Sequence, residues 1–173
     1  MKTLSTLALL TAASAAQAYT LDVQVGHANS NDFENSSIVG FGIGSQLNNE
    51  FHLGFNVLSK TLRADLSSPD QFQGVDAKVR TATFDLTYEL SPGGIRPFIG
   101  AGVGMAWFQG ASISSSNVLA TKLFAGVTFQ ISTSVDLVLT AQHSQLYNIH
   151  VIPNDAGFNT NNWEALAGLR FKF

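Results

Sequence analysis

The sequence predicts an all-β protein, an eight-stranded antiparallel transmembrane β-barrel of up-and-down topology. Three observations support this fold. Apolar and polar residues alternate with a period of two along most of the chain, and long and short polar connections alternate between the segments. Charged residues make up only 12% of a chain that is 45% apolar. An ordinary soluble domain carries about a quarter of charged residues, so this composition favours contact with a membrane.

The first 18 residues have the pattern of an export signal. Met1-Lys2 is a short basic start, residues 4–15 are almost all apolar or small, and Ala16-Gln17-Ala18 is a small-x-small cleavage site. This apolar run is too short to span a bilayer as a helix, and no later stretch approaches the roughly 18 apolar residues that such a helix needs. We therefore expect a signal peptide over residues 1–18 and an outer-membrane barrel domain over residues 19–173.

The alternation is clearest in two segments. In Ile95–Phe108 one row carries apolar side chains such as Val103 and Trp107, while the other row consists mostly of glycine and other small residues. In Trp163–Phe173 an apolar and aromatic row alternates with a row that is small or charged. The same template predicts six further strands, at Tyr19–Ala28, Ile38–Leu47, Phe51–Lys60, Val79–Leu90, Leu119–Ile131 and Val135–Tyr147.

The polar rows indicate which face lies inside the barrel. They hold five acids and four bases: Asp22, Asp85, Glu89, Asp136, Glu164, Arg96, Lys122, Arg170 and Lys172. The interior of an eight-stranded barrel is just wide enough for side chains to fill, so this nearly balanced set suits a lumenal network of ion pairs. The apolar rows are expected to face lipid, at mid-membrane through Leu53, Leu86, Val103, Leu123 and Leu139. A soluble periplasmic lipocalin-like ligand binder would reverse the two faces, and this alternative stays open.

The connections assign the two ends of the barrel. With the amino terminus in the periplasm, the periplasmic turns are Asn48–Glu50, Ser91–Gly94 and Ser132–Ser134. The external loops are then the longer segments Asn29–Ser37, Thr61–Lys78, Gly110–Val118 and Asn148–Asn162. Aromatic side chains form two belts, with Phe51, Tyr88, Phe129, Phe171 and Phe173 toward the periplasm and Trp107, Tyr147 and Trp163 toward the outside.

Two short motifs resemble known barrels. The run from Arg96 to Gly104, RPFIGAGVG, resembles the fifth strand of the OmpA-like and opacity-type family of small outer-membrane barrels. The alternating end Leu169–Phe173 resembles the signal that hands such barrels to the assembly machinery. The resemblance implies a place in the outer membrane of a Gram-negative bacterium, among outer-membrane lipid and lipopolysaccharide, and recognition by the assembly machinery through the strand that ends at Phe173.

The sequence favours a non-enzymatic surface protein, a closed barrel that presents polar extracellular loops for adhesion, host contact or envelope integrity. The net charge of −3 and the lack of a Lys/Arg cluster give no footprint for nucleic acid. With no cysteine and with four dispersed histidines, we expect no metal, cofactor or catalytic site. The runs Gly40-x-Gly42-x-Gly44 and Gly100-x-Gly102-x-Gly104 lack the spacing of a dinucleotide motif, so these glycines are expected to make room inside the barrel wall.

The last hairpin supports one enzymatic alternative. Gln142-His143-Ser144-Gln145, with Pro153-Asn154-Asp155 and Glu164, distantly resembles lipid A deacylases, which are eight-stranded barrels with a Ser, a His and an acid on the outer wall. In that family the His and the Ser lie two residues apart and share a face. Here Ser144 follows His143 directly, so strand alternation puts them on opposite faces, where they cannot exchange a proton. We expect polar rim residues instead, and Glu164 as a lumenal partner of Arg170 or Lys122.

Overall fold

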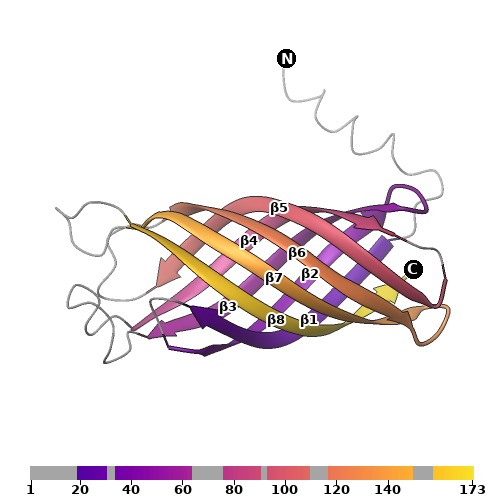
Figure 1. Cartoon of the computed structure of the whole chain (residues 1–173), viewed down its shortest axis with the longest axis horizontal. Helices are drawn as coiled ribbons and strands as arrows, with labels where there is room; N and C mark the ends of the chain where they lie inside the picture. Colours follow the sequence, from indigo (N-terminus) through magenta and orange to yellow (C-terminus); the bar gives the residue numbers. More distant parts are fainter. Residues whose placement is uncertain (1–18, 31–33, 64–75, 91–92, 110–116, 150–157) are drawn as a thin grey trace, which may run out of the picture.

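The computed structural model describes residues 19–30, 34–63, 76–90, 93–109, 117–149 and 158–173, so the predicted signal peptide lies outside the described residues. Eight antiparallel strands form a closed barrel in sequence order (Figure 1). No helix among the described residues is long and apolar enough to cross a membrane. The strands are β1 (Tyr19–Ser30), β2 (Ser36–Gln46), β3 (Phe51–Arg63), β4 (Asp76–Glu89), β5 (Ile95–Gln109), β6 (Asn117–Gln130), β7 (Val135–Ile149) and β8 (Phe158–Lys172).

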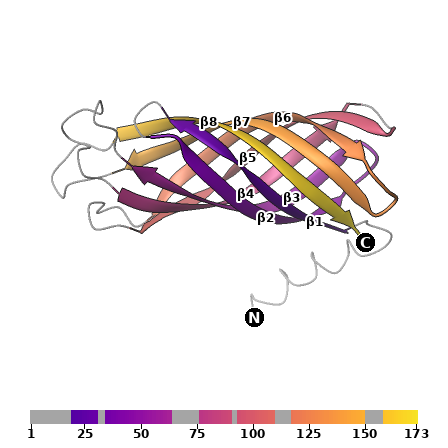
Figure 2. The same cartoon turned by 90° about the horizontal axis from the view of Figure 1, so that it is seen from below.

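The first and the last strand close the barrel side by side (Figure 2). Their shared ladder runs from the pair Thr20 and Lys172 to the pair Ser30 and Asn162. Beyond it, the backbone N–H of Phe173 donates to the carbonyl oxygen of Tyr19 at 3.0 Å. Closure leaves no strand edge unpaired, and a bilayer requires this because hydrocarbon offers the backbone no hydrogen-bond partner.

The two ends of the barrel differ in their connections. At the turn end, the ends of β2, β4 and β6 and the starts of β3, β5 and β7 lie together with the start of β1 and the end of β8 (Figure 1). At the loop end, the strands lead into segments 31–33, 64–75, 110–116 and 150–157, which lie outside the described residues. The predicted strand order and the turns Asn48–Glu50 and Ser132–Ser134 are confirmed, whereas residues 91 and 92 of the predicted turn Ser91–Gly94 lie outside the described residues. The strands reach further into the predicted loops than expected.

The largest such difference is in β8, which begins at Phe158 rather than at Trp163. Its polar start suggested a loop, yet Thr160 and Asn162 point inward and are fully buried. Past the hydrocarbon region the outward row of a strand can be polar, so the apolar alternation that marks a strand is lost there. Opposite this start, β7 carries an irregularity between Leu146 and Ile149, where Asn148 adopts a left-handed φ of 56°, a conformation that Asn tolerates well.

The outward rows are apolar, as predicted. Leu53, Leu86, Val103, Leu123 and Leu139 are 42–67% exposed, whereas the lumenal Lys122 and Asp136 are at most 7% exposed. In water these rows would form an apolar surface far larger than soluble proteins show, so the barrel belongs in a bilayer. A lipocalin-like barrel needs the apolar rows inside, and that alternative is wrong. Toward the turn end, Phe51 and Tyr88 pack as neighbours with ring centroids 5.1 Å apart.

Candidate functional site

Ten charged side chains of the described residues point into the lumen, and all ten form ion pairs with one another. Nine of the ten are those predicted from the polar rows. The tenth is Lys60, which lies in the same inward row of β3 as His52 and Asn56. Following the alternation to the end of the predicted strand would have found it. With Lys60 included, five acids face five bases, and the formal charges of the lumen cancel.

A chain of ion pairs crosses the turn-end half of the lumen. It starts on β1 and β8, where the Arg170 guanidinium donates two hydrogen bonds to the Asp22 carboxylate, from Nε at 2.9 Å and from Nη2 at 3.1 Å. This two-pronged geometry is the strongest that Arg offers a carboxylate. From Arg170 the chain continues to Glu89 on β4 at 3.7 Å, and from Glu89 to Arg96 on β5 at 3.2 Å. Because β4 and β8 lie on opposite sides of the barrel, the chain spans its interior.

From Arg96 the chain of ion pairs continues to Asp136, which is fully buried on β7, and it ends at Lys172 on β8. The Arg96 guanidinium donates to one oxygen of this carboxylate, and the Lys172 ammonium donates to the other at 2.8 Å. Glu89, Arg96, Asp136 and Arg170 each have two charged partners, so the removal of one pair leaves another in place. The chain therefore acts as a redundant network rather than as separate pairs.

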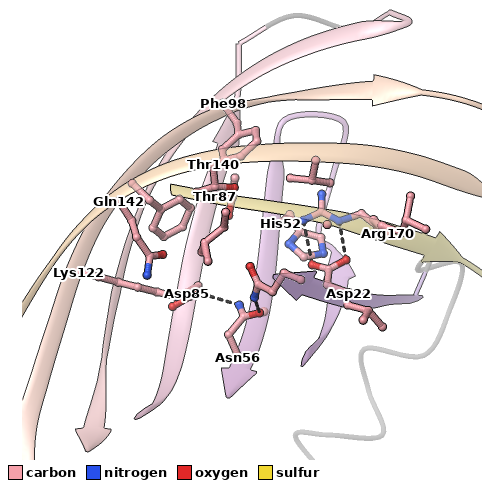
Figure 3. Close-up of a pocket in the computed structure, with 18 residues that line it drawn as sticks. Asp22, His52, Asn56, Asp85, Thr87, Phe98, Lys122, Thr140, Gln142 and Arg170 are labelled. Carbon is pink, nitrogen blue, oxygen red and sulfur yellow. Dashed lines mark hydrogen bonds and ion pairs between the residues drawn. The ribbon is translucent and has the colours of Figure 1, made fainter. Parts of the chain in front are cut away.

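A second group of polar side chains lies near the middle of the lumen (Figure 3). The Lys122 ammonium lies 2.7 Å from the Asp85 carboxylate, which also accepts a hydrogen bond from Asn56 Nδ2 at 2.5 Å. Gln24 donates in turn to Asn56 at 3.3 Å. The Lys122 ammonium also lies over the ring of Phe124, 5.4 Å from its centroid. Together these contacts connect β1, β3, β4 and β6.

Two small cavities lie among these groups. One of about 50 Å³ is bordered by Asp22, Asp85, Lys122, Gln142 and Arg170 (Figure 3). Another of about 20 Å³ lies nearer the turn end, beside Glu89, Arg96 and Lys172. His52 borders both, with its Nε2 in a hydrogen bond of 2.9 Å to Thr20 Oγ1. The smaller space has room for about one water molecule and the larger for a few, so both suit hydration of the network rather than a bound solute.

The loop-end half of the lumen is mostly apolar, although it also contains the buried polar residues Lys60, Thr160, Asn162 and Glu164. Twelve buried side chains form what we call the loop-end plug: Leu62, Ala77, Val79, Ala106, Val118, Ala120, Leu146, Ile149, Ala28, Ile38, Leu58 and Leu166. Several of them are 1% exposed or less. Such a layer offers an ion nothing in exchange for its hydration shell. The polar lumen is therefore closed at the loop end by side chains of the barrel wall itself.

One ion pair is enclosed by this plug. The Lys60 ammonium lies 2.5 Å from Glu164 Oε1, and both side chains are almost fully buried. Glu164 also accepts hydrogen bonds from Gln142 and from Ser144 Oγ, the latter at 3.0 Å. The prediction that Glu164 pairs with Arg170 or Lys122 is wrong. Arg170 lies six residues further along β8, roughly 20 Å away at about 3.3 Å per residue, and Lys122 is taken by Asp85.

The glycine rows make room for this interior, as predicted. A Cβ on Gly102 would lie 2.1 Å from Asp85 Oδ1, and one on Gly42 would lie 2.1 Å from Asn56 Oδ1. A Cβ on Gly100 would lie 2.3 Å from the ring of Phe124. Each of these glycines therefore lies beneath a lumenal side chain that extends over it from a neighbouring strand. This packing role accounts for the glycine runs without a nucleotide-binding site.

The last hairpin separates its candidate nucleophile from its candidate base. Ser144 points into the lumen and donates to Glu164, whereas the outward ring of His143 packs against Trp163 at 4.9 Å between centroids. Gln145, also outward, accepts a hydrogen bond from the Tyr147 hydroxyl at 2.7 Å. Pro153-Asn154-Asp155 lies outside the described residues. Within the part of the chain that is described, no three His, Asp or Glu side chains gather as a metal site.

Solved structures with the same architecture are outer-membrane barrels. Neisserial surface protein A superposes with a TM-score of 0.68 at 15% identity, covering 91% of this chain and 97% of that protein. Outer Membrane Protein W of E. coli has a TM-score of 0.57 at 12% identity, covering 92% and 100%. The outer membrane enzyme PagL has a TM-score of 0.51 at 15% identity, covering 86% and 97%. No protein-family model and no curated protein sequence matches the chain.

These likenesses define the class. The chain has the fold of the eight-stranded barrels of the Gram-negative outer membrane. At such low identity the likeness extends to the fold and not to the role of any neighbour.

Proposed function

We propose that this protein is a non-enzymatic surface protein, a closed barrel that presents its loop end to the cell exterior for adhesion, host contact or envelope integrity. The observation that carries the proposal is the filled lumen, with paired charges at the turn end and the apolar plug at the loop end. A filled lumen favours a scaffold over a transport path, and loops on a rigid scaffold are where recognition concentrates.

Two engineered thiols in this cysteine-free chain test placement and orientation. Val103→Cys, in the middle of the apolar belt, should resist a water-soluble maleimide in intact membranes and react with a lipid-soluble one. Gln109→Cys, at the loop end of β5, should react with a membrane-impermeant reagent on intact cells. Labelling of Gln109→Cys only after the outer membrane is permeabilised would put the loop end in the periplasm and refute the proposal.

Replacing individual loops while the barrel is kept intact tests whether the loops carry the function. Segments 64–75 and 110–116 can each be replaced by a Gly-Ser linker, because the two strands that flank each segment pair with one another up to its edge, as Arg63 with Asp76 and Trp107 with Asn117. We expect normal barrel levels in the membrane together with reduced binding to host cells or reduced resistance of the envelope to detergent. If both traits survive every loop exchange, the loops are not the functional part.

The main competitor is a lipid A deacylase-like hydrolase. The opposite orientations of Ser144 and His143 count against it, because a nucleophile needs its base within hydrogen-bond reach. Refolded protein incubated with lipopolysaccharide should release no hydroxy-acyl chain above a heat-denatured control. Release of such a chain, lost in Ser144→Ala, would replace our proposal by the hydrolase.

A further inference from the structure

The basic residues outside the lumen gather in one place. Of the nine Lys and Arg residues of the chain, Lys2 lies outside the described residues and five lie in the lumen. The other three are Arg63 on β3 and Lys78 and Arg80 on β4, all exposed at the loop end. These two strands are adjacent, although the residues between them hide the cluster in the sequence. In the described parts of the other six strands, the outward row carries no Lys, Arg, Asp or Glu.

Polar and aromatic side chains flank the two cations of β4. In the ladders, Arg80 lies opposite Trp107 of β5, and Lys78 lies opposite Gln109 of the same strand. On the other side, their partners on β3 are hydroxyl residues, Ser59 opposite Arg80 and Thr61 opposite Lys78. Three neighbouring strands thus offer two cations, two hydroxyls, an amide and an indole in one continuous patch.

This patch sits at the border between hydrocarbon and head groups. One step toward the turn end, the outward row across the same strands is apolar, with Val57, Ala82 and Met105 in register. Trp107 lies level with Arg80, and Trp side chains mark the interface of a membrane. A cation costs about 2–4 kcal/mol at mid-bilayer but only about 0–1 near the interface, so this is the depth at which an outward cation is tolerated and can meet a head group.

The charges of the patch are not neutralised within the described barrel. Every lumenal base has a carboxylate partner, whereas Lys78 and Arg80 form no ion pair with any described residue. Arg63 differs, since it stands opposite Asp76 in the ladder of β3 and β4. The uncompensated charge of the patch is therefore that of Lys78 and Arg80.

We propose that Lys78 and Arg80, beside Trp107, form a binding site for the phosphate groups of lipid A in the outer leaflet. The guanidinium matches two phosphate oxygens at once, and the ammonium adds a point charge one ladder step further out. The hydroxyls of Ser59 and Thr61 supply further donors at the same level. This inference rests on the proposed function, in which the loop end faces the cell exterior. It adds a ligand, the phosphate groups of lipid A, that binds the barrel wall rather than the loops.

Trp107 allows a direct test, because the chain contains only one other Trp, Trp163. In a Trp163→Phe background, folded protein in zwitterionic micelles is titrated with bis-phosphorylated lipid A, and the fluorescence of Trp107 is followed. We expect saturable binding that Lys78→Gln with Arg80→Gln weakens by about tenfold for each cation removed, on the scale of one charged hydrogen bond. Lipid A stripped of its phosphates should bind as weakly to the parent as intact lipid A binds to the double variant.

Four controls keep the outcome interpretable. The exchange Lys78→Arg with Arg80→Lys retains both charges and should bind within a few-fold of the parent, and heat-modifiable migration on a gel verifies that each variant is folded. Arg63→Gln, which removes a charge opposite Asp76, should have a smaller effect than either single change on β4. Inorganic phosphate at equal concentration should not displace lipid A.

The proposal is overturned if dephosphorylated lipid A binds as tightly as the intact lipid, if the double variant binds like the parent, or if free phosphate competes at equal concentration. Labelling of Gln109→Cys shows separately whether the loop end faces the cell exterior, as the proposed function requires. If this thiol stays unlabelled on intact cells while binding in micelles still depends on phosphate, the anion site exists but faces the periplasm, and the proposed function is wrong.

Discussion

The two halves of the lumen are stabilised in different ways. In the turn-end half, charged side chains form one connected network in which four members have two ionic partners each. In the loop-end half, apolar side chains surround a single pair, Lys60 and Glu164. Buried charge is therefore stabilised here in two ways, by several ionic partners in the turn-end half and by the three hydrogen bonds that Glu164 accepts in the loop-end half.

The largest expected effect is that of Glu164→Gln. It leaves the Lys60 ammonium buried without an anion, which costs about 3–5 kcal/mol of unfolding free energy. Urea unfolding in lipid vesicles, followed by Trp fluorescence, measures the loss. The double variant Lys60→Met with Glu164→Leu removes both charges and should regain most of the stability, because no charged group is then left buried among the apolar side chains of the plug. A double variant no more stable than Glu164→Gln would show that the pair itself is not what the site requires.

Loss of packing in the plug should rank second. Leu146 is 1% exposed within the plug, so Leu146→Ala opens a cavity and costs about 2–4 kcal/mol. Leu139→Ala on the same strand is the matched control, since Leu139 faces outward and lipid can fill the space it leaves. Equal losses for the two variants would contradict a packed plug.

In the turn-end network, the replacement of a glutamate by glutamine should lower the free energy of unfolding less than Glu164→Gln does. Glu89→Gln leaves Arg96 with Asp136 and Arg170 with Asp22, so we expect a loss of about 1–2 kcal/mol. The comparison with Glu164→Gln, measured in the same vesicles, is the sharpest test of redundancy. A loss for Glu89→Gln as large as that for Glu164→Gln would mean that the network fails as a unit when one link is removed.

Deletion of Phe173 should have the smallest effect on the folded state. Its side chain is 78% exposed, so its removal should cost less than about 1 kcal/mol. If the carboxyl-terminal strand is the assembly signal that it resembles, much of the exported protein should nevertheless remain unassembled in the periplasm. Cell fractionation measures this, with deletion of Tyr19, whose carbonyl oxygen accepts a hydrogen bond from the N–H of Phe173, as the matched control on β1. Normal membrane levels of the protein without Phe173 would argue against the signal.

Much of this fold could be predicted because a barrel wall repeats one local rule. The period of two assigned Val103 outward and Lys122 inward, and turn residues separated the strands in the right order. The rule fails where lipid no longer constrains the outward row, as at the polar start of β8 from Phe158. It also cannot identify partners across the lumen, because these depend on strand stagger, and so Glu164 was assigned to the wrong base.

The basic patch on β3 and β4 escaped prediction for a related reason. Arg63 and Lys78 are separated by fourteen intervening residues in the sequence, and the predicted loop Thr61–Lys78 contained both of them. Only the pairing of β3 with β4, which continues to Arg63 and Asp76, brings them together on one face. Extending the two strands by alternation alone would have placed the three cations outward but not beside one another.

Conductance in planar bilayers tests most directly whether the lumen is closed. The turn-end network fills its half of the lumen with paired charges, and the plug fills most of the loop-end half with apolar side chains that offer an ion no replacement for its hydration shell. We expect the wild-type barrel to show no stable openings in the range of general porins, at any applied potential that leaves the bilayer intact. Stable, reproducible openings of that size would contradict a filled lumen, and with it the role of the barrel as a closed scaffold.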